Sequence, residues 1–224
     1  MKPILMAACF CVAVTAALSQ NCNYYFLQNG KTAEITVFNK KNAESGKNVY
    51  KISSVSKSGS TTTAVVDAEL FDKKGKSFAK ATNNMKCEGG ALMVDLKMFM
   101  SPEQAGQLKA EAKAADVFLS YPSSMKAGDA LDDGHFTMNI KQDNGIESTV
   151  TINITDRKVE GQESVTTPAG TWNCFKITYK TNIKITMMGI GIPVKGDVTE
   201  WFAPNFGVVK TESRGGTTML TKFQ

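Results

Sequence analysis

The segment from Thr171 to Met187 constrains the fold more than any other, because apolar and polar side chains alternate along nearly all of it. One set consists of Phe175, Ile177, Tyr179, Ile183 and Ile185, with Thr181 among them, and the other of Lys176, Thr178, Lys180, Asn182 and Lys184. Successive side chains of a β-strand point to opposite faces. The alternation therefore predicts a long strand with one buried and one wet face, as in antiparallel sheets.

Most of the remaining chain reads as shorter strands joined by polar turns. Asp72–Lys76 and Asp143-Asn144-Gly145 are hairpin signals. Further strands are predicted at 32–39, 49–57, 61–71, 77–87, 91–96, 136–141, 148–159, 194–202, 207–213 and 217–223. With Thr171–Met187 these segments number eleven and predict a sheet of about ten strands, and an alternating sheet of that size must curl to bury its apolar face.

One helix is predicted midway along the sequence, from Ser101 to about Ala115. Ser101 is a good N-cap, Pro102 suits the first helical position, and Gln104 completes a capping box. The expected fold is mainly β: a curved antiparallel sheet, a half-barrel or open barrel of about ten strands, with this helix packed on or in its concave face.

Residues 1–19 resemble a secretory signal peptide. Lys2 supplies the positive start, an apolar run extends from Ile4 to Leu18, and Ala17-Leu18-Ser19 offers small residues for cleavage before Gln20. The run is shorter than the roughly 20 residues that span a bilayer, which disfavours a membrane anchor. We expect an exported protein, in the periplasm or at the cell surface, with residues 20–224 as a single domain and no transmembrane segment in the mature chain.

Charge and cysteine content exclude several classes of partner. The chain has 26 basic and 21 acidic residues, a net charge of +5, and the basic residues are scattered, which disfavours nucleic-acid binding. Three cysteines follow residue 19, and an odd number leaves one unpaired. Cys174 lies in a strand pattern, so Cys22–Cys87 is the preferred disulfide. His135 is the only histidine, and no metal or cofactor is expected.

Three sequence blocks resemble a known family. They are Tyr121–Leu131 (YPSSMKAGDAL), Thr167–Phe175 (TPAGTWNCF) and Glu200–Lys210 (EWFAPNFGVVK). Together they resemble the TapB-like secreted proteins related to domain of unknown function 3108, which are common in Bacteroidota. The resemblance implies an exported, β-rich, non-enzymatic domain, similar in shape to half-barrel lipoprotein carriers. It carries no established functional residues.

No catalytic spacing occurs in the sequence, so we expect no enzyme. His135 follows an Asp-Asp-Gly turn, and no Gly-x-Ser-x-Gly elbow exists. The leading hypothesis is an envelope binding module for an apolar or lipid-like small molecule. The alternatives are a structural or protein-interaction domain of the envelope and, third, an envelope hydrolase.

Methionine supports the binding hypothesis, because its pliable side chain suits adaptable apolar pockets, although core filling is its usual use. The predicted ligand contacts are Met98, Met100, Leu108, Met187, Met188 and Trp201. Trp201 is also expected to anchor the core, with Phe202 on the opposite face of the same strand.

Overall fold

The computed structural model describes residues 22–99, 117–141, 147–187 and 190–224. Two short 3-10 turns are the only helical segments in these ranges: η1 (Tyr25–Leu27) and η2 (Leu96–Phe99). The twelve strands are β1 (Thr32–Asn39), β2 (Glu44–Ser58), β3 (Thr61–Asp72), β4 (Ser77–Glu88), β5 (Ala91–Asp95), β6 (Phe118–Tyr121), β7 (Gly134–Lys141), β8 (Glu147–Thr167), β9 (Gly170–Met187), β10 (Ile190–Ala203), β11 (Gly207–Ser213) and β12 (Gly216–Phe223).

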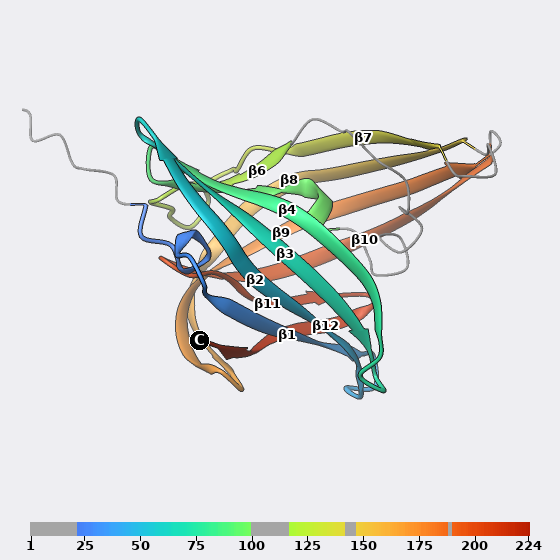
Figure 1. The fold of residues 1–224 in the computed structure, drawn as a ribbon, viewed down its shortest axis with the longest axis horizontal. Helices are drawn as coiled ribbons and strands as arrows, with labels where there is room; N and C mark the ends of the chain where they lie inside the picture. The colour runs from blue at the N-terminus through green and yellow to red at the C-terminus, as the bar shows by residue number, and fades with distance from the viewer. Residues whose placement is uncertain (1–21, 100–116, 142–146, 188–189) are drawn as a thin grey trace, which may run out of the picture.

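All twelve strands form one antiparallel sheet. Its order is β6-β5-β4-β3-β2-β1-β12-β11-β10-β9-β8-β7, so the chain folds as two meanders joined through β1 and β12. The sheet curls into a nearly closed barrel (Figure 1). The strands at the two ends of this order, β6 and β7, follow one another in the chain.

The expected half-barrel of about ten strands with a helix on its concave face is therefore wrong. The sheet has twelve strands and curls until it is almost closed, which is more than in a half-barrel. β6 was missed because its few apolar residues follow directly on the predicted helix and resemble the end of that helix. The predicted helix itself, 101–115, lies outside the described residues.

The gap between β6 and β7 is closed by side chains. A Cβ atom placed on Gly134, at the start of β7, would lie 2.9 Å from Leu119 Cδ1 of β6 and 3.1 Å from Leu96 Cδ2 of η2. Only a residue without a side chain allows this approach. The segment before β7 also pairs with β8, through the Leu131 N–H to Arg157 O and the Val159 N–H to Asp129 O. We call this region, where the two ends of the sheet meet, the seam.

The N-terminal segment is held to the barrel by aromatic rings and a disulfide. Tyr25 of η1 stacks on Phe206 at 4.7 Å between ring centroids, and Trp172 lies 4.7 Å from Phe206. Cys22 and Cys87, the pair preferred from the sequence, form a disulfide with a Cα–Cα distance of 5.6 Å. Cys174 is free and buried. The first residues of the described chain are thus fixed to β4.

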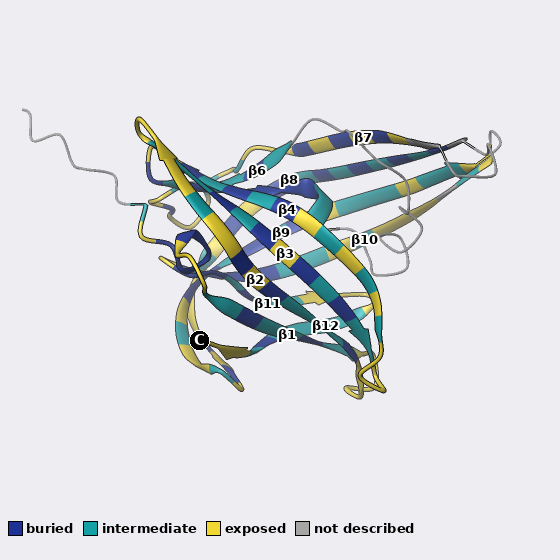
Figure 2. Cartoon of the chain, viewed as in Figure 1, coloured by how far each residue is buried: buried dark blue, intermediate teal, exposed yellow. Residues whose placement is uncertain are grey.

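The distal parts of β7, β8, β9 and β10 project beyond the rest of the barrel (Figure 1). We call this projection the wing: residues 134–141, 147–155, 181–187 and 190–197. β10 pairs with β11 only from Val198 to Ala203, so residues 190–197 have no neighbour on that side among the described strands. Figure 2 shows that buried positions are frequent on β7 and β8 and give way to exposed ones along distal β10.

Neighbouring valines on β3 test the inward and outward assignment of the barrel strands. Val66 is fully buried, whereas Val65 is half-buried and points to the other face. We expect Val66→Asp to prevent folding, because it buries an unpaired charge, and Val65→Asp to change the melting temperature little. Circular dichroism melts of both variants decide this. Equal effects would show that the faces of β3 are assigned wrongly.

Candidate functional site: a buried polar cluster below an apolar face

An arginine is buried inside the barrel because of an irregularity in β8. Asp156 has a positive φ of 56°, and the pairing with β9 shifts between Thr155 and Lys158. Such a β-bulge changes which face the following side chain occupies. Arg157 consequently has only 2% of its surface exposed.

Arg157 ties the seam together from within. Its Nη1 donates hydrogen bonds to the carbonyl oxygens of Ser120 in β6, at 3.0 Å, and of Asp132 before β7, at 2.8 Å. Its guanidinium lies over the Tyr121 ring, 4.9 Å from the centroid, and the same ring stacks on Phe202 at 4.7 Å. One side chain thus joins both ends of the sheet and packs on an aromatic pair of the core.

Glu200 is the acidic member of this group and is completely buried. It is paired with Ile177 in the β9–β10 ladder, and Phe202 with Phe175, so all four side chains point to the interior. Its carboxylate oxygens make no hydrogen bond of ordinary geometry among the described residues, although the hydroxyls of Tyr121 and Tyr179 lie close enough to affect its titration. Burial of such a group is costly unless it is paired.

The electrostatics of Glu200 reflect a balance between burial and its neighbours. Burial raises the pKa of Glu200, while the positive charge of Arg157 and the hydroxyls of Tyr121 and Tyr179 act in the opposite direction. Burial, and then the nearby negative charge of Glu200, raise the pKa values of Tyr121 and Tyr179 well above the usual range. Both tyrosines therefore stay protonated.

Arg157, Glu200, Tyr121 and Tyr179 form what we call the buried polar cluster. Besides both oxygens of Glu200, its unpartnered buried atoms are Nε and Nη2 of Arg157 and the hydroxyl of Tyr121. Buried polar atoms in proteins nearly always have a partner, a water molecule or a ligand group. The cluster thus offers both donors and acceptors to a small polar group.

An apolar face leads from this cluster out along the wing. Directly opposed residues of neighbouring strands share a face, and one row runs Phe136–Ile152–Ile183–Val194 across β7, β8, β9 and β10. Phe136 and Ile152 are at most 1% exposed, Ile183 is half-buried, and Val194 is 62% exposed. The next row, Met138–Val150–Ile185, is buried on β7 and β8 and half-buried on β9. The core therefore continues into an open apolar surface, the apolar face.

Comparison with known proteins identifies the family. The sequence model of the DUF3108-like family matches residues 28–220. The chain belongs to the DUF3108-like family. Among curated proteins, none matches this DUF3108-like chain significantly.

Two solved structures share the fold of this DUF3108-like protein. One, from Bacteroides fragilis, is described as a "putative exported protein with YmcC-like fold"; it has a TM-score of 0.72 and 22% identity, over 90% of this chain and 98% of that chain. The other is a "putative lipoprotein" from Parabacteroides distasonis, with a TM-score of 0.73 and 21% identity, over 90% and 99%. At this identity the likeness establishes the fold.

The three sequence blocks that pointed to the DUF3108-related family have structural roles in the barrel. Tyr121–Leu131 runs along the seam and contributes Tyr121 to the buried polar cluster. Thr167–Phe175 forms the β8–β9 turn, where Trp172 Nε1 donates to Thr167 Oγ1. Glu200–Lys210 supplies Glu200 and the β10–β11 turn, in which Asn205 adopts a positive φ of 62°. Two of the blocks therefore meet in the cluster.

The residues predicted to contact a ligand are not brought together. Met98 is half-buried in η2 and packs against the core, and Met187 is 40% exposed at the end of β9. Trp201 is opposite Lys176, so it lies on the other face from Met187 and, at 3.3 Å per residue, about 36 Å away along β9. The other predicted contacts, Met100, Leu108 and Met188, lie outside the described residues.

Trp201 and Phe202 are both buried, on opposite faces of β10. Phe202 points into the barrel and stacks on Tyr121. Trp201 is covered by Lys210, whose Nζ lies 4.4 Å from the ring centroid, and its Nε1 donates to Glu163. Phe202, rather than Trp201, contacts the buried polar cluster.

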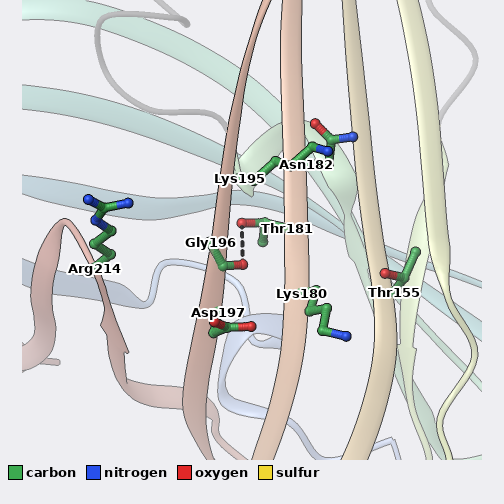
Figure 3. A pocket seen from close by; sticks show the side chains of 8 residues that line it. All are labelled: Thr155, Lys180, Thr181, Asn182, Lys195, Gly196, Asp197 and Arg214. Carbon is green, nitrogen blue, oxygen red and sulfur yellow. Dashed lines mark hydrogen bonds between the residues drawn. The ribbon is translucent and has the colours of Figure 1, made fainter.

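The polar face of the wing carries an open groove of about 660 Å³ (Figure 3). Lys180, Lys195 and Asp197 border it from β9 and β10, and Arg214 borders it from the β11–β12 turn. Lys180 is paired with Asp156 at 2.8 Å. The groove is an exposed, mainly cationic surface, and Thr181 and Gly196 of the inward-facing row also line it.

Metal-ligating residues do not cluster within the described part of the chain. His135 lies exposed on β7, rather than in a turn, and is hydrogen-bonded to Asn153 Oδ1. Across the same ranges, no helix has the length and apolar character that crossing a membrane requires.

Removing Arg157 tests its role in the seam. Arg157→Leu should lower the free energy of unfolding by about 3–5 kcal/mol, because it leaves Glu200 as an uncompensated buried charge and removes two hydrogen bonds. Lys158→Leu is the matched control, since Lys158 is exposed and its 3.6 Å pair with Glu160 contributes little. Urea unfolding of both variants measures the difference. Equal, small losses would contradict the role of Arg157.

The raised pKa of Glu200 predicts a defined pH dependence. The group titrates near 4.5 in the unfolded chain and higher in the folded chain, so the folded state binds the proton more tightly. Its contribution to stability is complete below pH 4.5 and is lost as the pH rises through the folded pKa. Wild type should therefore lose stability relative to Glu200→Gln as the pH rises above 4.5, by at most about 1.4 kcal/mol per pH unit. Urea unfolding at several pH values measures this, and a pH-independent difference would refute it.

Proposed function

We propose that this protein is an exported binding module that holds a lipid-like molecule against the apolar face of the wing. The single observation that carries the proposal is the row Phe136–Ile152–Ile183–Val194, which is continuous with the core at one end and exposed at the other. Monomeric soluble proteins rarely expose an apolar surface of this kind unless something binds it.

The shape of the surface favours a chain-like ligand. The exposed residues, Met187, Ile190 and Val194, lie on the last two strands of the wing, and the half-buried Ile183 and Ile185 separate them from the core. An extended acyl chain can lie along such a strip and replace water over its length. Each buried methylene contributes about 0.8 kcal/mol, so even part of a chain suffices for micromolar binding.

Export of the protein is part of the proposal. It is supported by the signal-like sequence of residues 1–19 and by the descriptions of the two solved structures as an exported protein and a lipoprotein. The role assigned is binding, with no chemical step.

A protein-interaction domain is the second candidate, favoured by the unpaired edge of β10 from 190 to 197. Such an edge can accept a strand of another chain. Pro193 and Lys195 lie on it, however, and these are residue types by which natural proteins prevent edge pairing. The apolar face therefore favours the ligand.

Two double variants test the proposal. Ile183→Ser with Val194→Ser removes two directly opposed apolar side chains of the strip and should weaken binding of dodecanol about tenfold, because two branched side chains no longer contact the chain. Lys184→Ser with Lys195→Ser, on the polar face of the same strands, is the matched control and should leave binding unchanged. Displacement of the neutral fluorescent probe N-phenyl-1-naphthylamine measures affinity. Equal affinities of both variants, or no binding to wild type, would refute the proposal.

A further inference from the structure

We propose that the buried polar cluster of Arg157, Glu200, Tyr121 and Tyr179 is the anchor for the polar end of the ligand, and that this end is an uncharged group that both donates and accepts hydrogen bonds, such as a hydroxyl or a primary amide. This inference rests on the proposed function, because it assigns the end of the ligand whose chain lies on the apolar face.

The position of the cluster supports this assignment. Inward-facing residues follow one another along β9 from Ile185 and Ile183 through Thr181 to Tyr179, so the apolar face ends at the cluster. The row in between contains Gly196, where an added Cβ would meet only Thr181 Oγ1, at 3.8 Å. On β9 and β10 this row contains only Thr181 and Gly196, whereas Ile154 occupies it on β8, and Val198 lies opposite Tyr179 in the next row.

The chemistry of the cluster selects the head group. Glu200 offers two unpartnered acceptor oxygens, while Arg157 and Tyr121 offer unpartnered donors. Arg157 and ionised Glu200 compensate each other in charge. An ionic head would upset this balance in a buried place, where an unpaired charge is costly. A hydroxyl or amide satisfies atoms of both kinds and adds no charge.

The residues that fix the cluster hold it rigidly. Arg157 is fixed by two hydrogen bonds to the main chain across the seam, and Tyr121 by its stacking on Phe202. Preorganised polar groups discriminate well, because a ligand that lacks the matching group leaves them unpartnered.

The test uses five ligands with one chain and different heads: dodecanol, dodecanamide, dodecanoate, dodecylamine and dodecane. Displacement of N-phenyl-1-naphthylamine from the full mature protein measures their affinities. We expect dodecanol and dodecanamide to bind at least fivefold more tightly than the two ionic compounds and dodecane. Tyr121→Phe should weaken dodecanol about fivefold, the value of one hydrogen bond.

Tyr50→Phe is the matched control, because Tyr50 is also buried in the barrel but its hydroxyl accepts from Asn48 and lies outside the cluster. It should leave dodecanol binding unchanged. Both variants are assayed well below their melting temperatures, because the Tyr121 hydroxyl also interacts with Glu200 and Arg157, so a loss of affinity cannot be ascribed to unfolding.

The outcomes separate the two proposals. If no compound displaces the probe, the lipid-binding function is wrong and this inference falls with it. If all five bind equally, or if Tyr121→Phe binds dodecanol as wild type does, the function stands and the anchor is refuted. Tighter binding of dodecanoate than of dodecanol would also refute the neutral head group and would indicate a carboxylate beside Arg157.

Discussion

The hydrogen bonds from Arg157 across the seam are the interaction on which the rest of the structure depends. When a sheet curls until its ends meet, the main-chain groups of its edge strands must either bond to each other or find other hydrogen-bond partners, because buried carbonyl and amide groups rarely lack them. Here β6 and β7 approach through Gly134, Leu119 and Leu96 without a strand ladder. One guanidinium supplies the donors that this arrangement lacks.

That solution has a consequence in the core. A guanidinium inside the barrel is a buried charge, and it requires an opposite charge nearby. Glu200 supplies it, and the stacked rings of Tyr121 and Phe202 pack around the pair. This polar centre in a mainly apolar barrel is therefore first a requirement of closure. The unpartnered atoms that remain make it also suitable for recognition of a polar group.

Much of the fold could be predicted from the sequence, because period-two alternation directly reports which face is buried. β1 has the predicted bounds, and β9 begins one residue before its predicted start. The buried polar cluster could not be predicted in the same way. The bulge at Asp156 breaks the alternation that would place Arg157 outside. The inward position of Glu200 could have been recognised, because Glu200 alternates with Val198 and Phe202 along the strand and so lies on their face. A carboxylate in a strand, however, ordinarily faces outward.

Unequal strand lengths explain why an apolar face is exposed at all. β8, β9 and β10 have 21, 18 and 14 residues, whereas β11 and β12 have seven and eight. A strand of seven residues can cover only half of β10, so the distal halves of the long strands must project, and their inward faces lose the opposite wall of the barrel. Alternation within these strands nevertheless continues to their ends, with Ile183, Ile185 and Val194 still on the inner side. A sequence that needed only a closed core would gain solubility by making these positions polar. Closure of the barrel therefore does not explain their apolar character, whereas the proposed ligand would.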